Sequence, residues 1–305
     1  MYYNLQSFGY DLRQTRTNLG LTQKEVCKLS SIHVDTLRKI ENGKVTPTQE
    51  TLDLLSPVLK KDLNQLLLKY RLNNYSTFKK IRNILEAKID RGEYETLSIE
   101  LDDLEALLNT ESNTYFINLI NQLKLLTESI ILNKKYNKLN ESLDKLIEAI
   151  KITTPVFSFD NYKTFVYNSI ELRILMNIAL LINKIECTEE SLEIMEFCIK
   201  SVEPNDYIYP KICYNLAYTY HRLDIHEKAL KYSNLGINYC NEHRNHNGLN
   251  HLYFRKGIAE YHLEYNNYKD SLKKAIVFSE MLGQYNLKNI IIINCRKLYN
   301  INIQL

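Results

Sequence analysis

Apolar residues near the start of the chain recur every three or four positions, which is the spacing of one face of an amphipathic helix. Phe8, Leu12, Thr15 and Leu19 follow this spacing, and Gly20 stands where a helix C-cap residue would stand. The pattern predicts a first helix that ends at about residue 20.

A capping box predicts a second helix. In Thr22-Gln-Lys-Glu25 the threonine hydroxyl can accept a hydrogen bond from a free backbone N–H, and the glutamate carboxylate can accept one from the cap residue. This helix is expected to run from about residue 23 to 29 and to bury Val26, Cys27 and Leu29.

A third helical segment follows after a short turn. The turn covers residues 30–32, and Leu37 and Ile40 are spaced to face inward in the segment 33–42. Two short helices joined by so tight a turn form a helix-turn-helix, whose second helix enters the major groove of DNA. Residues 1–70 are therefore predicted to be a DNA-binding domain.

The motifs of this segment resemble the lambda-repressor-like (Xre-type) helix-turn-helix family. The resemblance rests on Leu12-Arg13-x-x-Arg16, Gly20-Leu21-Thr22-Gln23, Ile40-Glu41-Asn42-Gly43-Lys44 and Pro47. The chain departs from the family pattern at three positions. Ser31 replaces the usual turn glycine, His33 replaces a Ser or Thr, and Val34 replaces a polar base reader. A serine at the turn must then adopt the left-handed conformation.

The resemblance assigns roles in DNA binding to individual side chains. Gln23 and Lys44 are expected at phosphates, and Val34, Asp35 and Lys39 at base edges, where a valine can meet a thymine methyl group. The full set of DNA-binding candidates is Gln23, His33, Val34, Asp35, Thr36, Arg38, Lys39 and Lys44.

Two of the charged residues in this domain have alternative roles within the protein. Arg38 is three residues from Asp35, so the two can pair on the helix surface instead of reaching DNA. Glu41 is expected to bond to the first helix, because phosphate repels a carboxylate.

From Tyr75 onward the pattern is helical, with breaks that recur. Ala179, Ala217 and Ala259 stand 38 and 42 residues apart, each at the middle of a predicted helix that is followed by a polar turn and a second helix. This resembles the tetratricopeptide repeat with its spacing stretched beyond ~34 residues. Such helix pairs stack into a right-handed superhelix with a concave face. The alternative is an irregular α-bundle.

The predicted fold class is therefore all-α. A lambda-repressor-like helix-turn-helix domain at 1–70 precedes a tetratricopeptide-like superhelix at 71–305. Composition agrees, because eight Gly and five Pro are few for the turns of a 305-residue sheet protein.

Charge and cysteine usage narrow the functional class. Residues 1–70 hold ten Lys and Arg against seven Asp and Glu, so the net charge of +3 resides entirely in the predicted DNA reader. The six cysteines form no C-x-x-C pair, and the chain has neither a signal-peptide pattern nor an apolar run of membrane-spanning length. We expect a cytoplasmic protein that has no membrane partner.

The concave face of the repeats is predicted to bind a peptide. Asn177 and Asn215 occupy the same repeat position, and an amide can pair with a peptide backbone as both donor and acceptor. Nearby cations can take a carboxylate. The candidates are Arg173, Asn177, Lys211, Tyr214, Asn215, Tyr218, Arg222, Asn250 and Tyr253. The alternative is that these are ordinary solvated residues of an Asn-rich chain.

No catalytic or cofactor motif is present, so we expect neither an enzyme nor a cofactor. The sequence lacks a P-loop, a dinucleotide fingerprint, a zinc-protease H-E-x-x-H and a G-x-S-x-G elbow. His243 and His246 lie in a polar connection beside Glu242, and Cys187 and Cys198 lack paired histidines. No metal site is expected at either place.

Domain order and length resemble the Gram-positive peptide-pheromone regulators of the Rgg, PlcR and PrgX kind. The resemblance implies a homodimer or higher oligomer that binds a double-stranded operator, and a short signalling peptide in the repeat groove that controls this binding, as in quorum sensing. Two other hypotheses stay open. One is a phage or mobile-element repressor whose helical domain only oligomerises, and the other is a repeat scaffold that binds a partner protein.

Overall fold

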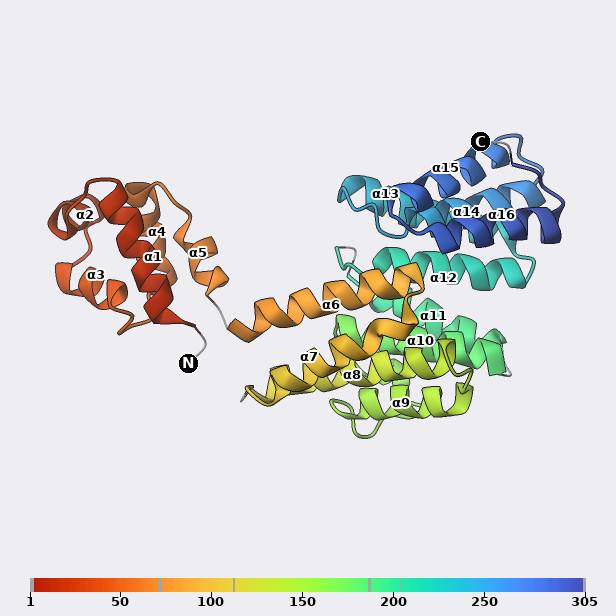
Figure 1. The fold of residues 1–305 in the computed structure, drawn as a ribbon, viewed down its shortest axis with the longest axis horizontal. Coiled ribbons are helices and arrows are strands. Elements are labelled where there is room, and N and C mark those ends of the chain that lie inside the picture. The colour runs from red at the N-terminus through yellow and green to blue at the C-terminus, as the bar shows by residue number, and fades with distance from the viewer. Residues whose placement is uncertain (1–2, 71–72, 112, 186–187, 204, 304–305) are drawn as a thin grey trace. The chain divides into compact units, whose positions relative to one another are not determined.

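The computed structural model describes residues 3–70, 73–111, 113–185, 188–203 and 205–303. The chain divides into two compact units, Met1–Ile81 and Arg82–Leu305, and the division falls within one helix. In the described ranges the regular elements are α-helices and two short 3-10 helices (Figure 1). The predicted all-α fold class is confirmed.

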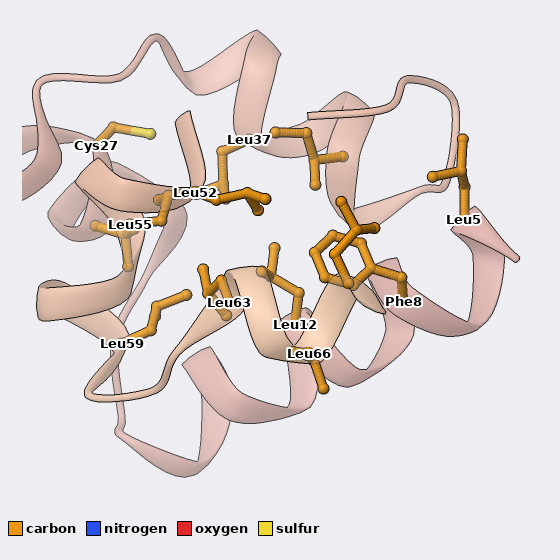
Figure 2. Packing of buried hydrophobic residues seen from close by; sticks show 13 residues of the cluster. Leu5, Phe8, Leu12, Cys27, Leu37, Leu52, Leu55, Leu59, Leu63 and Leu66 are labelled. Carbon is orange, nitrogen blue, oxygen red and sulfur yellow. The ribbon is translucent and has the colours of Figure 1, made fainter. Parts of the chain in front are cut away.

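Five short helices and the beginning of a sixth form the first unit. They are α1 (Leu5–Asn18), α2 (Gln23–Ser30), α3 (Val34–Glu41), α4 (Gln49–Leu59), α5 (Leu63–Lys69) and α6 (Asn73–Arg91). Figure 2 shows the core between them, in which Phe8 and Leu12 of α1 meet Leu37 of α3 and Leu55 of α4. Phe8, Leu12 and Leu37 thus lie on the faces that the helical spacing predicted to point inward.

The beginning of α2 has the predicted capping box. The Thr22 hydroxyl accepts from the Glu25 backbone N–H at 3.2 Å, and the Glu25 carboxylate accepts from the Thr22 backbone N–H at 2.7 Å. At the other end Ser31 takes φ 59°, so the serine adopts the left-handed conformation that the family motif requires of its turn.

One buried position in α2 differs from the prediction. Leu29 is 65% exposed, while Ser30 is buried and donates its hydroxyl to the Val26 carbonyl at 2.8 Å. Val26, Cys27 and Ser30 define the inward face, and at 100° per residue Leu29 lies about 110° around the helix from the middle of that face. The predicted burial of Leu29 is wrong because its position lies outside the face that Val26, Cys27 and Ser30 bury.

Helices packed in neighbouring pairs form the second unit. After the end of α6 and a 3-10 turn at Tyr94–Thr96 come α7 (Leu97–Leu108), α8 (Thr114–Lys134), α9 (Leu139–Lys151), a 3-10 turn at Tyr162–Thr164, α10 (Ser169–Ile185), α11 (Thr188–Ser201), α12 (Tyr209–Arg222), α13 (His226–Glu242), α14 (Leu249–His262), α15 (Tyr268–Met281) and α16 (Tyr285–Tyr299). Figure 1 shows the pairs stacked in chain order as α8–α9, α10–α11, α12–α13 and α14–α15, and α16 packs against α15.

Small residues allow these helices to approach closely. Ala179, Ala217 and Ala259 are fully buried at the middle of α10, α12 and α14. A Cβ atom added to Gly257 of α14 would lie 2.7 Å from the Leu272 side chain of α15. The repeated alanine position is therefore buried in all three helices, and the glycine two residues before it in α14 is where that helix approaches α15 most closely.

The cysteines and the hydropathy of the helices were also compared with the expectations from sequence. Cys27, Cys198, Cys213, Cys240 and Cys295 are buried and unpaired, and Cys187 lies outside the described residues. In the described parts of the chain no helix is long and apolar enough to cross a bilayer.

Candidate nucleic-acid interface and repeat groove

His33 supplies the N-terminal cap of α3. Its backbone is extended, with φ −69° and ψ 140°, and its Nδ1 accepts a hydrogen bond from the Asp35 backbone N–H at 3.2 Å. An imidazole nitrogen thus takes the place of the hydroxyl oxygen that a Ser or Thr would bring. The ring itself remains exposed, as predicted for the DNA-facing end of this helix.

The outer face of α3 and the turn that follows it carry both free and paired charges. Arg38 Nη2 lies 2.8 Å from Asp35 Oδ1, so the surface pair that the spacing allowed is formed. Lys39 and Lys44 are exposed and make no ion pair with any described residue. Thr36 is half-buried. The two lysines are therefore available for phosphates or bases in this conformation.

Val34 has a partly structural role. It is half-buried and packs against the hydrophobic core of the first unit. Only the remaining part of its surface can meet a base.

Buried polar contacts bind α3 to the two helices before it. Arg16 Nε donates to Glu41 Oε1 at 2.6 Å, and Arg16 Nη2 donates to Glu41 Oε2 at 3.1 Å. The Gln23 side-chain amide donates to the same Glu41 Oε2 at 2.7 Å. The hydrogen bond from Arg16 raises the pKa of that guanidinium above its usual value. Glu41 bonds to the first helix as predicted.

Gln23 is held in a defined position at the beginning of α2. One N–H of its side-chain amide is used by Glu41, and its backbone N–H belongs to the first turn of the helix, where backbone donors lack intrahelical partners. The predicted phosphate contact therefore concerns its backbone and the remaining amide N–H.

Two adjoining cavities open on the second unit, with volumes of about 340 Å³ and 270 Å³. Both are lined by Asp90 and Arg91 of α6, and together they are called the groove below. Of the predicted peptide-binding residues, Lys211 lines the larger cavity and Arg173, Asn177, Tyr214 and Asn215 line the smaller one.

Two carboxylates of α6 form ion pairs with two cationic side chains of the groove. Arg173 Nη1 lies 3.0 Å from Glu86 Oε2, Lys211 Nζ pairs with the same oxygen, and Lys211 Nζ lies 3.0 Å from Asp90 Oδ1. Burial alone would raise the pKa of Glu86, but the Arg173 and Lys211 cations lower it to about 2. Glu86 is therefore ionised at neutral pH.

The Arg173 guanidinium keeps hydrogen-bonding capacity within this cluster. Its Nε is buried and has no hydrogen-bond partner among the described residues. A buried donor of this kind is costly to leave unpaired, so a further acceptor in the groove would be favourable.

The two aligned asparagines have the same local geometry. Asn177 Nδ2 donates to the Arg173 carbonyl at 2.7 Å, and Asn215 Nδ2 donates to the Lys211 carbonyl at 2.9 Å, each four residues back along its helix. These bonds fix the amides at the groove and leave each Oδ1 as an acceptor.

Four predicted residues do not line the groove. Asn250 is 0% exposed and donates its amide to Gln284 in the connection between α15 and α16, so its predicted place on the concave face is wrong. The Asn250 amide instead supplies a hydrogen bond to the Gln284 side chain. The other three are Tyr253, stacked on Phe278; Tyr218, under the Arg255 guanidinium; and Arg222, exposed at the end of α12.

Several groove residues were missed in the sequence. Glu86 and Asp90 were overlooked, although Arg82, Glu86 and Asp90 recur every four residues and so share one helix face. His251 also lines the groove, where its ring stacks on Tyr214 at 4.6 Å and burial lowers its pKa to about 4. The sequence feature that could have drawn attention to His251 is its separation of four residues from Arg255, which puts both on one face of α14.

Comparisons with known proteins agree with this architecture. Residues 12–66 match the family model described as helix-turn-helix. No curated protein matches the chain by sequence. The molecule as a whole has the fold in which a helix-turn-helix domain precedes tetratricopeptide-like helix pairs.

Solved structures with this fold include three bacterial proteins. PlcR of Bacillus thuringiensis, in complex with the peptide PapR7 and DNA, matches with a TM-score of 0.70 and 17% identity over 94% of this chain and 99% of that chain. ComR of S. thermophilus, with DNA and its signalling peptide ComS, matches at 0.61 and 14% over 93% and 97%. The SHP pheromone receptor Rgg2 of Streptococcus dysgalactiae matches at 0.59 and 11% over 95% and 99%.

Proposed function

We propose that this protein is a transcription regulator whose binding to a DNA operator is controlled by a short signalling peptide held in the groove. Residues 1–70 would bind DNA, and residues 71–305 would bind the peptide and form a homodimer in the cytoplasm. The observation that carries the proposal is that one chain has both exposed, unpaired lysines at α3 and just after it, and a groove lined by cations. Its fold is that of PlcR and ComR, both of which were solved with peptide and DNA.

The DNA-binding half of the proposal rests on α3. Lys39 and Lys44 are exposed and unpaired among the described residues, and Arg38 can exchange its surface partner Asp35 for a phosphate at little cost. His33, Asp35 and Thr36 lie at the N-terminal end of α3, the end that enters the major groove of DNA in helix-turn-helix proteins.

The chemistry of the groove favours an anionic peptide. Its lining includes five cations, Arg82, Arg91, Lys134, Arg173 and Lys211, against the two carboxylates Glu86 and Asp90. A peptide carboxylate can replace Glu86 at Arg173 and Lys211, and it can accept from the unpaired Arg173 Nε. The Asn177 and Asn215 amides then pair with the peptide backbone.

Replacement of Glu86 provides the coupling that regulation requires. A ligand shifts a conformational equilibrium only if it binds the two states with different affinity. A peptide that competes with the α6 carboxylates binds tightly only when they have left their partners. Peptide binding therefore releases α6, the helix in which the two units of the chain are joined.

The test is a mobility-shift experiment with the full chain and the DNA upstream of its own gene. It is run with and without synthetic peptides that correspond to short reading frames beside the gene. We expect a shift that a peptide changes. A shift that no peptide changes favours the repressor whose helical domain only oligomerises, and the absence of any shift favours a scaffold for a partner protein.

Two pairs of variants separate the two halves of the proposal. Lys39→Ala should weaken DNA binding and its salt dependence, whereas Lys297→Ala, the same charge change at the exposed end of α16, should not. Asn215→Ala should keep DNA binding and lose the peptide response, whereas the exposed Asn302→Ala should retain both. Equal behaviour within a pair would contradict the assigned interface.

A further inference from the structure

Three of the seven histidines meet at one end of the repeat helices, outside the groove. His221 is in the last turn of α12, His226 is the first residue of α13, and His262 is the last residue of α14. One ring nitrogen of each can be chosen so that all three lie within 4.8 Å of one another. Neither the peptide nor the DNA interface uses these side chains.

The separation of two of these nitrogens matches that of ligands on one metal ion. His221 Nδ1 and His226 Nδ1 are 3.3 Å apart. Two imidazole nitrogens bound to a tetrahedral Zn²⁺ at ~2.0–2.1 Å are separated by about 3.3–3.4 Å. The third ring lies close by, since His262 stacks on His226 with ring centroids 4.2 Å apart and an interplanar angle of 10°. Because a nitrogen lone pair lies in the plane of its ring, the exposed His262 ring must turn out of this stack to share the ion.

The far nitrogens of the same two rings lie near groups of the kind that orient metal ligands in other proteins. His221 Nε2 is 2.8 Å from the Tyr299 hydroxyl, and His226 Nε2 is 3.7 Å from the Asp224 carboxylate. Histidine ligands of metals commonly bond through their second nitrogen to a carboxylate or another polar group, which fixes the ring and its tautomer. The two Nδ1 atoms lie within hydrogen-bonding distance of each other, so a bound ion would replace the proton that they share.

His243 makes a useful comparison, since it has neighbours but no converging histidines. Its ring stacks on Tyr239 at 4.3 Å, and its Nε2 lies 3.3 Å from Asn205 Oδ1. The His243 ring thus makes only local contacts, whereas His221, His226 and His262 converge.

We propose that His221, His226 and His262 form a binding site for a divalent transition-metal ion of the Zn²⁺ type. Three imidazole ligands leave a fourth position for water or for an external ligand, as in open zinc sites. The ion connects the ends of α12, α13 and α14, so its binding stabilises the C-terminal repeats.

The test uses the untagged full chain, first freed of metal with a chelator. ZnCl₂ is titrated by calorimetry at neutral pH, and Co²⁺ is added separately to record the visible absorption of a tetrahedral nitrogen site. We expect one Zn²⁺ per chain, a Co²⁺ spectrum of that type, and a Tm that rises with Zn²⁺ concentration. Absence of stoichiometric binding by a correctly folded chain would overturn the proposal.

Variants locate the ion. His262→Gln, at an exposed position, should lower Zn²⁺ affinity about 100-fold while circular dichroism confirms the fold, and Tyr299→Phe should lower it about 10-fold through loss of the outer hydrogen bond. His243→Gln should leave affinity unchanged. Unchanged affinity in His262→Gln, or an equal loss in His243→Gln, would place the ion elsewhere and sink the assignment.

Discussion

Individual buried charges in this protein are held by partners from distant parts of the chain. Arg16 and Glu41 are 25 residues apart in sequence, and Glu86 and Lys211 are 125 apart. Ions of this kind lose much hydration on folding, and removal of one partner leaves the other uncompensated. Such sites should therefore be sensitive to single substitutions.

The Arg16–Glu41 pair provides the first prediction. Glu41→Ala leaves the buried Arg16 guanidinium without its carboxylate and frees the Gln23 amide, so the first unit should lose about 3–5 kcal/mol of unfolding free energy. Urea unfolding of the full chain measures the change.

The matched control for this prediction lies on the same short helix. Asp35→Ala removes an ion pair whose two side chains are both more than half exposed, so the expected loss is about 1 kcal/mol or less. If both variants lost the same amount, the burial of Glu41 would not be what gives its pair its strength.

Glu86 provides a second prediction at this scale, with a defined pH dependence. Glu86→Gln leaves Arg173 and Lys211 without most of their compensating charge and should cost about 3 kcal/mol at neutral pH. The folded-state pKa of Glu86 is lowered to about 2 from 4.5. Its stabilisation is therefore complete above about pH 4.5 and is lost as the pH falls toward 2.

Unfolding of wild type and Glu86→Gln along a pH series measures this dependence. The difference between them should shrink steadily below pH 4.5. Glu95→Gln is the control, because the Glu95 carboxylate is mostly exposed and solvent screens its pair with Lys135, so its removal should change stability little at any pH in the series. A difference that stays constant down to low pH would show that Glu86 acts through its shape rather than its charge.

At the scale of elements, helix packing depends on how near one backbone comes to another. A Cβ added to Gly9 of α1 would lie 2.5 Å from the Ile40 carbonyl oxygen and 2.6 Å from that of Glu41, both on α3. The corresponding atom at Gly257 of α14 would meet the flexible side chain of Leu272 first. Backbone cannot yield as a side chain can.

The two glycines therefore predict different responses to the same change. Alanine favours a helix over glycine by about 1 kcal/mol, but Gly9→Ala must push α1 away from α3 and should destabilise the first unit by about 3 kcal/mol. Gly257→Ala should cost about 1 kcal/mol, since Leu272 can change its rotamer. Thermal unfolding compares them, and a stabilised Gly9→Ala would show that the two helices are free to separate.

At the scale of the whole molecule, the division into two compact units predicts two unfolding transitions. Glu41→Ala should lower only the midpoint of the first unit, and Glu86→Gln only that of the second. Circular dichroism and calorimetry at one fixed protein concentration measure both midpoints. A single transition that both variants lower equally would mean that the two units unfold as one.

Much of the candidate DNA interface was predictable from sequence because its signals are local. The capping box at Thr22, the left-handed Ser31 and the His33 cap each depend on residues within a few positions. The burial of Leu29 was mispredicted because Ser30, rather than Leu29, completes the inward face of α2. The groove was predictable only in part. Repeat alignment identified Asn177 and Asn215, but it did not indicate that residues of α6 line the groove as well.

The sequence by itself determined that the chain is helical, where its helices begin, and which faces they bury, because helix spacing and caps are set by neighbours three and four residues away. Only the tertiary structure decided that Glu86 pairs with Arg173 and Lys211, that Asn250 is buried, and that His221, His226 and His262 converge. These contacts join segments dozens of residues apart, and their distances follow from the packing of whole helices, which no local pattern encodes.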